Sequence, residues 1–329
     1  MTNGKFVISL DFELQWGVRD KKSINHQYSK NIVGVHTVIP RLLSTFKKFK
    51  ISGTFSTVGF LFFESKEQLL ANIPANTPAY VDQNLSPYTG HFDLVGANYK
   101  EDLYHFAPQL LAEIKKYPEQ EIGSHTYSHY YCLENGQTIE QFRDDLNLAI
   151  KIAENNKVKI TSLVFPRNQF NEEYLKVCTD FNITCYRGNE HSWIYEAKKG
   201  EEDSSSRRIL RLLDTYINIS GHNCYSSEFL KSQFPINLPS SRFLRPYSNK
   251  LKIFEKLRLY RIKSGMTYAA KNNLLYHLWW HPHNFGVNQD ENFQFLEKIL
   301  EHYSFLQKKY KFESITMSNL AHELKNETK

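Results

Sequence analysis

The 329-residue chain has few cysteines and no long apolar run. Its cysteines are scattered and form no C-x-x-C pair, so we expect free thiols at all of them: Cys132, Cys178, Cys185 and Cys224. No stretch of about eighteen apolar residues occurs, which predicts that no helix spans a membrane. The N-terminal sequence also lacks the charged and long apolar segments of a signal peptide. These absences together lead us to expect a cytoplasmic protein.

A strong charge of either sign is also absent. The formal net charge of +6 is modest for this length, and no dense basic stripe occurs, so nucleic acid is not an expected partner. Hydrophobic content of 41% and charged content of 23% are typical of a soluble globular protein. Aromatic residues are abundant at 14%, which fits either a sugar-binding cleft or an aromatic-rich core.

Short apolar strands alternate with helical patterns along the chain. We expect strands at 5–10, 54–60, 121–124, 162–165, 183–186, 274–280 and 313–316. We expect helices at 34–50, 107–117, 138–155, 171–181 and 289–310, with a short helix at the C-terminus. This alternation predicts an α/β fold with parallel strands. We interpret residues 1–329 as a single domain with insertions at about 66–105 and 198–273.

A basic run lies inside the second expected insertion. It has one acid, Glu255, against Lys250, Lys252, Lys256, Arg258, Arg261 and Lys263. A solvated helix face is one interpretation of this run. Contact with an anionic glycan, a diphosphate or a membrane surface is the alternative.

A pair of histidines stands out in the segment EIGSHTYSHYYC at 121–132. His125 and His129 are four residues apart, and on one helical turn their imidazoles would point the same way. Two imidazoles suit a divalent metal such as zinc, cobalt or nickel. The alternative is a pair of polar residues on one helix face.

Polar residues also follow three other expected strands. Asp11 and Glu13 follow the first, Arg167 follows the strand at 162–165, and His281 and His283 follow the strand at 274–280. The carboxyl ends of parallel strands are where α/β folds keep their reactive groups. The sequence therefore predicts that these side chains meet the histidine pair at one end of a sheet.

Four segments in order resemble the motifs of a known family: SLDFELQWG at 9–17, HTYSH at 125–129, FPRNQ at 165–169 and HLWWHPHNFG at 277–286. They are similar to those of the polysaccharide deacetylase family, the NodB-homology enzymes of carbohydrate esterase family 4. The resemblance implies a deformed (β/α) barrel of about seven strands. It also implies a metal-dependent hydrolase that removes acetyl groups from sugars.

The resemblance implies roles for individual residues of the expected catalytic machinery. Asp11 resembles the catalytic base, and Arg167 resembles the arginine that keeps the base ionised, although the family's R-x-P order is altered here. His281 resembles the general acid, with His283 as the second candidate.

The metal ligands implied by the resemblance are His125, His129 and an acidic residue. The family usually has two adjacent aspartates, the second of which binds the metal, but Phe12 occupies that position here. Some members use D-x-D instead, so Glu13 is the candidate third ligand. In a regular strand Asp11 and Glu13 share a face, which lets both reach one ion. We expect a divalent cation, with Zn²⁺ first and Co²⁺ or Ni²⁺ as alternatives.

Candidate substrate-binding residues are the aromatic or imidazole side chains near these motifs: Trp16, Tyr130, Trp193, Trp280 and His283. Trp279, beside Trp280, is a further candidate for a sugar-stacking wall, and core packing is the competing role for these aromatic residues. For Arg242 and Arg245 we expect ion pairs within the insertion, with binding of anionic substrate groups as the alternative.

The function expected from the motifs is metal-dependent deacetylation of an N-acetylated sugar or polysaccharide precursor. A nucleotide- or lipid-linked sugar is the expected kind of precursor, with weak contact to a membrane surface. A small-molecule amidase or cyclic imide hydrolase on the same scaffold is one alternative. A non-catalytic, glycan-binding relative is the other.

Overall fold

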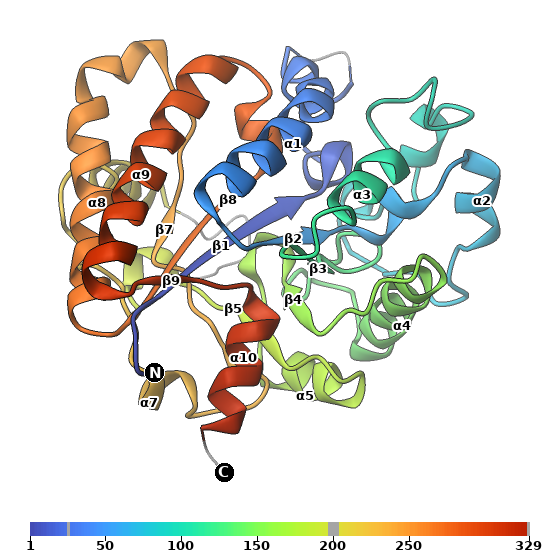
Figure 1. Cartoon of the computed structure of the whole chain (residues 1–329). Coiled ribbons are helices and arrows are strands. Elements are labelled where there is room, and N and C mark those ends of the chain that lie inside the picture. Colours follow the sequence, from blue (N-terminus) through green and yellow to red (C-terminus); the bar gives the residue numbers. More distant parts are fainter. Residues whose placement is uncertain (25–26, 197–203, 328–329) are drawn as a thin grey trace.

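A computed structural model describes residues 1–24, 27–196 and 204–327, and Figure 1 shows the chain as a curved sheet surrounded by helices. Residues 198–203, at the start of the second expected insertion, lie outside the described residues. No helix in the described part of the chain is long and apolar enough to cross a membrane. The four cysteines are free, as the sequence predicts.

The described strands form one sheet in which all paired strands are parallel. Its order is β6-β5-β4-β3-β2-β1-β8-β7, and β9 pairs with β1. The strands are β1 (Lys5–Phe12), β2 (Gly53–Thr57), β3 (Glu121–Ser124), β4 (Ser162–Val164), β5 (Cys185–Arg187), β6 (Ile236–Asn237), β7 (Arg242–Phe243), β8 (Leu275–Trp280) and β9 (Glu313–Ser314).

The segment 236–244 closes the sheet into a barrel. Its first part pairs with β5, since the Leu238 N–H donates to the Tyr186 carbonyl at 2.9 Å. Its last part pairs with β8, since the Leu244 N–H donates to the Trp279 carbonyl at 2.8 Å. The barrel walls are therefore β1 to β5, this segment and β8, which confirms the expected deformed (β/α) barrel of about seven strands. The range 198–273, expected as an insertion, thus contains one wall of the barrel.

Helices cover the outside of the sheet (Figure 1). They are α1 (Ser29–Phe49), α2 (Lys66–Ala71), α3 (Pro108–Ile114), α4 (Ile139–Asn155), α5 (Glu172–Asp180), α6 (Ser205–Asp214), α7 (Ser227–Leu230), α8 (Glu255–Lys271), α9 (Gln289–Tyr310) and α10 (Met317–Asn326). A capping box begins α4, because the Thr138 hydroxyl accepts from the Gln141 N–H while the Gln141 side chain accepts from the Thr138 N–H. The range 66–105, expected as an insertion, contains α2 and short 3₁₀ turns.

The alternation of β1 separates the core from the site. Every residue of this strand is buried. Phe6, Ile8 and Leu10 belong to the main hydrophobic core. Ser9 and Asp11 alternate with them, so they point to the opposite face, into the barrel. Polar side chains therefore point into the barrel interior at the C-terminal ends of β1 and β8.

Candidate active site

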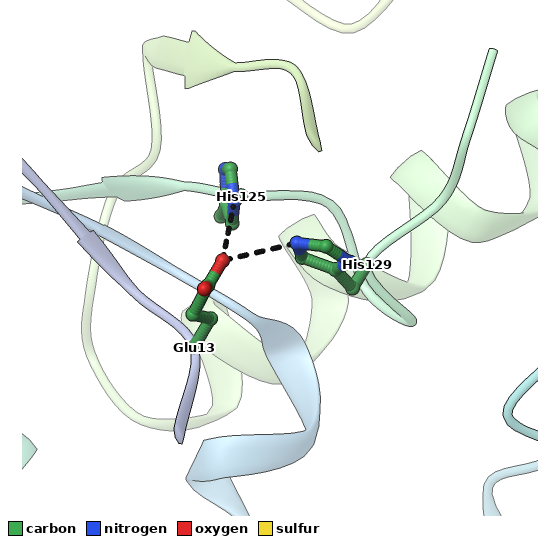
Figure 2. Close-up of side chains that lie close together, drawn as sticks. All are labelled: Glu13, His125 and His129. Atoms are coloured by element: carbon green, nitrogen blue, oxygen red, sulfur yellow. Dashed lines mark hydrogen bonds and ion pairs between the residues drawn. The ribbon is translucent and has the colours of Figure 1, made fainter. Parts of the chain in front are cut away.

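Glu13, His125 and His129 meet just past the ends of β1 and β3 (Figure 2). Glu13 Oε2 lies 3.2 Å from His125 Nε2 and 3.0 Å from His129 Nε2. All three side chains are buried, and in the described part of the chain they are the group whose ligand atoms could surround one metal ion. The structure thus brings together the three residues for which the sequence predicted a metal site.

The donor atoms of this group fit a cation. His125 Nδ1 lies 2.8 Å from the Val164 carbonyl oxygen, which can only accept, so Nδ1 carries a proton. In the neutral ring, Nε2 then has a lone pair that points towards the Glu13 carboxylate. The His125 nitrogen and the Glu13 oxygen are then both hydrogen-bond acceptors, with no proton between them. A cation between them resolves this conflict, and a carbonyl behind the imidazole is the usual support of a ligating histidine.

His129 is held in its neutral form. Burial lowers the pKa of His129 to about 4, although Glu13 acts in the opposite direction. The Arg19 guanidinium, whose Nη1 lies 3.4 Å from His129 Nδ1, also lowers this pKa. An unprotonated imidazole is the form that binds a metal.

The histidine pair lies in a loop, so the expectation of one helical turn is wrong. After β3 the segment 125–132 has no regular secondary structure, and Thr126 and His129 adopt left-handed backbone angles, with φ of 63° and 58°. Asp145 of α4 holds this turn: its carboxylate accepts hydrogen bonds from the Tyr127 N–H at 2.7 Å and from the Ser128 N–H at 3.1 Å. Asp145 was not among the predicted site residues, since its position inside a helix gives no sign of this contact.

Asp11 lies beside the three candidate ligands and is paired with Arg187. The Arg187 guanidinium donates to both Asp11 oxygens, at 2.6 and 2.8 Å, and it also donates to Ser9 Oγ and Asn168 Oδ1. Burial alone would raise the pKa of Asp11, but Arg187, together with His125 and His281, outweighs burial and lowers that pKa. Asp11 is therefore ionised at neutral pH. Arg187 also stacks on the Trp279 ring, 4.0 Å from its centroid.

Arg167 does not pair with Asp11, so this part of the prediction is wrong. Its guanidinium pairs instead with Asp20 and with Glu134, the latter at 3.0 Å, and it stacks over the Tyr131 ring at 4.0 Å. The reason is its place after β4, in a turn where Arg167 has a left-handed φ of 54°. The side chain therefore lies near the Asp20 loop, while Arg187, the last residue of β5, reaches into the barrel.

His281 follows β8 and lies between the two acids. Its Nε2 is 3.7 Å from Asp11 Oδ2 and 3.6 Å from Glu13 Oε1, and the side chain is 24% exposed. His283 stacks on the His281 ring with centroids 4.9 Å apart, and its Nδ1 lies 3.8 Å from Glu13 Oε1. His283 is buried, and burial lowers its pKa to about 3. His281 is thus the more accessible of the two predicted candidates for the general acid.

A cavity of about 890 Å³ opens next to this group, and His281 forms part of its wall. Its polar wall includes five arginines, Arg167, Arg208, Arg211, Arg242 and Arg245. Acidic side chains also reach it, among them Asp20, Asp82, Glu134, Glu190 and Glu196. Arg242 forms the expected ion pair within its own region, with Asp214. A cavity of this size is in the range that holds small ligands.

Three of the expected aromatic contacts are wrong because the rings are in the core. Trp16 is 1% exposed and donates from Nε1 to the His105 carbonyl at 2.9 Å, and Tyr130 and Trp280 are fully buried. Trp193 is 60% exposed but is absent from the cavity wall. Trp279 does line the cavity, since alternation along β8 turns it inward while its neighbour Trp280 packs against the core.

His277 is a further buried imidazole inside the barrel. Its Nε2 lies 2.9 Å from Ser9 Oγ, which also accepts from Arg187, and its Nδ1 lies 2.9 Å from the Leu238 carbonyl. Burial lowers its pKa to about 3, so it is neutral. His277 thus supports Arg187 through the Ser9 hydroxyl. In the sequence, His277 stands two residues before Trp279, and this spacing on one strand indicates that both side chains share a face.

Comparison with known proteins finds similarity to one family. A polysaccharide deacetylase family model matches residues 33–186, a segment that contains both histidines of the candidate site. The whole chain is similar in structure to a protein described as a polysaccharide deacetylase from Mycobacterium smegmatis, with 13% identity, 99% coverage of this chain, 92% of that one and a TM-score of 0.60. The comparison with curated protein sequences gives no match.

Two further structures share the fold at similarly low sequence identity. A polysaccharide deacetylase structure from Pseudomonas aeruginosa matches with 11% identity, 97% and 89% coverage and a TM-score of 0.52. A GH57-type branching enzyme from Pyrococcus horikoshii matches with 14% identity, 98% and 70% coverage and a TM-score of 0.54. At such identities the structural likeness shows the fold, and the family model, over residues 33–186, matches the family that the motifs resemble.

Proposed function

This chain has the polysaccharide deacetylase fold, and residues 33–186 match the model of that family. We propose that it is a metal-dependent hydrolase of N-acetylated sugars or polysaccharide precursors. One observation carries the proposal. The Glu13 carboxylate lies within 3.2 Å of both His125 and His129, while His281 lies within 3.7 Å of both Asp11 and Glu13. Possible metal ligands, a carboxylate base and an imidazole acid are thus in one buried group.

The metal in this proposal is a divalent cation, with zinc favoured, held by Glu13, His125 and His129. A carboxylate and two imidazoles form a known catalytic zinc ligand set that leaves positions open. When bound, the ion would polarise the acetyl carbonyl and lower the pKa of a water molecule to about 7.

Asp11 is the proposed base. It is ionised because Arg187 holds its pKa down, and both of its oxygens are fixed by the same guanidinium. Each carboxylate oxygen keeps a second lone pair, so Asp11 can still accept a proton from water. A base in a fixed orientation needs little reorganisation when the proton moves.

His281 is the proposed acid. An amine cannot leave as an anion, so the nitrogen of the acetamido group must be protonated as the C–N bond breaks. His281 reaches both the acids and the cavity, which is the position that a proton donor to the leaving amine requires.

The cavity supports a sugar as the substrate. Trp279 offers an aromatic face in its wall, and the surrounding arginine and acidic side chains offer hydrogen bonds to hydroxyl or phosphate groups. A nucleotide- or lipid-linked sugar precursor combines a ring with phosphate groups, so it matches both features.

Acetate release tests this proposal. Zinc-loaded protein is incubated with N-acetylglucosamine oligomers, a nucleotide-linked N-acetylated sugar, small N-acetyl amides and a cyclic imide. We expect acetate from at least one sugar, and a loss of about 10²–10⁴-fold in rate for Asp11→Asn, the range of general base catalysis. Asp290→Asn, which changes an exposed acid of α9 that is not part of the cavity wall, is the matched control and is expected to keep the activity. Hydrolysis of the imide or of small amides alone would favour the amidase alternative, and binding of sugars without turnover would favour a glycan-binding protein.

A further inference from the structure

The outer surface formed by α6, the 3₁₀ helix η8 (Asn249–Phe254) and α8 exposes large apolar side chains. We call it the α6–α8 surface and define it by Ile209, Leu213, Ile217, Ile219, Ile253, Phe254, Leu257 and Tyr260, all of which are exposed. The most exposed are Ile253 at 75% and Tyr260 at 72%. Single exposed apolar side chains are normal, but a group of this size marks an interaction site.

The two stretches that supply this surface lie side by side. The Tyr216 and Phe254 rings are in contact, with centroids 5.6 Å apart. Further along α8, Arg261 donates to the Gly221 carbonyl at 2.5 Å and lies 3.5 Å from Asp214 Oδ1. These contacts hold the loop after α6 along α8, so both stretches form one surface. Figure 1 shows α8 at the edge of the molecule opposite α2 and α4.

Helix α8 distributes its side chains in an unusual way. Arg258 and Arg261 are buried, while Leu257 and Tyr260 next to them are exposed. The buried arginines have partners inside the molecule: Arg258 pairs with Glu255 at 2.5 Å and lies 3.7 Å from the centroid of the Phe295 ring, and Arg261 donates to the Gly221 carbonyl. A surface helix normally turns its apolar stripe inward. The outward apolar side chains of α8 therefore have no role in the core of this chain.

Lysines are interleaved with the exposed apolar residues. Lys250, Lys252 and Lys256 are exposed and alternate in sequence with Ile253, Phe254 and Leu257. The only acid within this stretch, Glu255, is already paired with Arg258. Basic side chains around protruding apolar ones are complementary to an anionic lipid surface, where the apolar groups enter the acyl boundary and the lysines contact headgroups. A second copy would instead place lysines against lysines, because a symmetric dimer pairs a surface with itself.

The α6–α8 surface also adjoins the cavity. Arg208 and Arg211 of α6, together with Thr215, line the cavity wall. Ile209 and Leu213 lie on a different face of the same helix and are exposed. One helix thus separates the cavity from the apolar surface, and a bilayer in contact with that surface would lie near the cavity.

From this geometry we propose that the α6–α8 surface docks the protein on anionic lipid bilayers as a peripheral membrane protein. The apolar side chains that enter the bilayer are Ile253, Leu257 and Tyr260. The lysines that contact the headgroups are Lys250, Lys252 and Lys256. This proposal does not rest on the proposed activity, because membrane binding is measured without turnover.

Vesicle sedimentation tests the docking. The full chain is mixed with vesicles of phosphatidylcholine alone or of phosphatidylcholine and phosphatidylglycerol at 3:1, at low and at high salt. We expect binding to the anionic vesicles that weakens with salt. Ile253→Ser/Leu257→Ser/Tyr260→Ser is expected to reduce the binding constant at least about tenfold. Lys250→Gln/Lys252→Gln/Lys256→Gln is expected to reduce it about a hundredfold, since each lysine near an anionic surface contributes about 1 kcal/mol.

Matched controls use the same changes elsewhere on the surface. Lys151→Gln/Lys157→Gln/Lys159→Gln removes the same charge near α4, and Leu70→Ser/Ile73→Ser/Leu94→Ser removes three exposed apolar side chains within the range 66–105. Both controls are expected to bind as the unchanged protein does, and circular dichroism checks that every variant is folded. Three results would overturn the proposal: no binding to anionic vesicles, equal weakening by the control variants, or a dimer that is lost in the α6–α8 variants while vesicle binding is absent.

Discussion

At the scale of single residues, the orientation of the Asp11 carboxylate depends on Arg187. Arg187 contacts both Asp11 oxygens and is itself fixed by Ser9, Asn168 and the face of Trp279. A guanidinium supplies two parallel N–H groups to a carboxylate, which a lysine cannot do. The orientation of the proposed base therefore depends on the shape of Arg187 as well as on its charge.

Replacing this arginine gives a direct prediction. We expect Arg187→Lys to lower kcat by about 10–10²-fold, because the charge stays while the two-point contact that orients Asp11 is lost. Arg167→Lys, the matched change at the arginine that pairs with Asp20, is expected to change kcat less than about threefold. Acetate release and thermal unfolding are measured together. Equal losses for the two variants would contradict the assignment of Arg187.

The adjacent tryptophans of β8 give a second prediction. Trp280→Ala should destabilise the fold by about 3–5 kcal/mol, because Trp280 is fully buried against Phe285 and Phe46. Trp279→Ala should mainly raise KM, since this ring lines the cavity. Denaturant unfolding and steady-state kinetics separate the two effects. A larger loss of stability for Trp279→Ala than for Trp280→Ala would contradict the inward and outward assignment.

Those residues of the site that directly follow a strand could be predicted from the sequence. Asp11, Glu13 and His281 follow or end apolar runs, and the period of two in a strand predicts that Asp11 and Glu13 share a face. The same parity, applied to β8, would have selected Trp279 over Trp280. Arg187 was missed because the expected strand at 183–186 stops one residue short of it.

At the scale of elements, the turn with the two histidines is shaped by α4. Asp145 accepts hydrogen bonds from two backbone N–H groups between His125 and His129, and from the Ser128 hydroxyl. Left-handed angles at Thr126 and His129 then turn both rings towards Glu13. The i, i+4 spacing is typical of a helix, but here a side chain distant in sequence determines the backbone.

Loosening this turn should weaken metal binding. Asp145→Asn replaces one acceptor oxygen by an amide donor that faces a backbone N–H. We therefore expect zinc affinity to fall by about 10–100-fold, which is the usual effect of mutating a residue that supports a metal ligand. Asp144→Asn, one position earlier on α4, is the matched control and should leave affinity unchanged. Zinc titration by calorimetry gives both values. An Asp145→Asn protein with the unchanged affinity would show that the turn holds without this carboxylate.

The order of helices and strands was largely predictable from periodicity. The expected helix at 289–310 and the expected strand at 121–124 match the observed α9 and β3. The barrel wall at 236–244 was not predictable, because it pairs with its neighbours through two strands of only two residues each. Such short ladders leave no alternating pattern in the sequence.

At the scale of the whole molecule, a buried ion cluster joins three elements on the α6–α8 side. Asp214 at the end of α6 pairs with Arg242 of β7 and Arg261 of α8. Burial raises the pKa of Asp214, but Arg242 and hydrogen bonds from Ser220 outweigh it, so the pKa lies below its ordinary value. The cluster thus links the segment that closes the barrel to the surface proposed to dock on lipid.

This cluster predicts how stability depends on pH. A carboxyl whose pKa is lower in the folded state stabilises the fold above its unfolded pKa of about 3.9, and this stabilisation is lost as the pH falls below that value. Asp214→Asn should cost about 3–5 kcal/mol at pH 7, because it leaves Arg242 buried without its counter-ion. The difference from the unchanged protein should shrink between pH 5 and pH 3. Denaturant unfolding at each pH measures it, and a difference independent of pH would argue against the lowered pKa.

A zinc titration of the metal-free protein tests whether Glu13, His125 and His129 bind one divalent cation. We expect about one zinc ion per chain. We also expect a loss of affinity of at least about a hundredfold in both Glu13→Gln and His125→Ala. The control Glu134→Gln, a carboxylate that pairs with Arg167 at the cavity, should bind zinc as the unchanged protein does. Zinc bound with the same affinity by Glu13→Gln, His125→Ala and the unchanged protein would contradict the account.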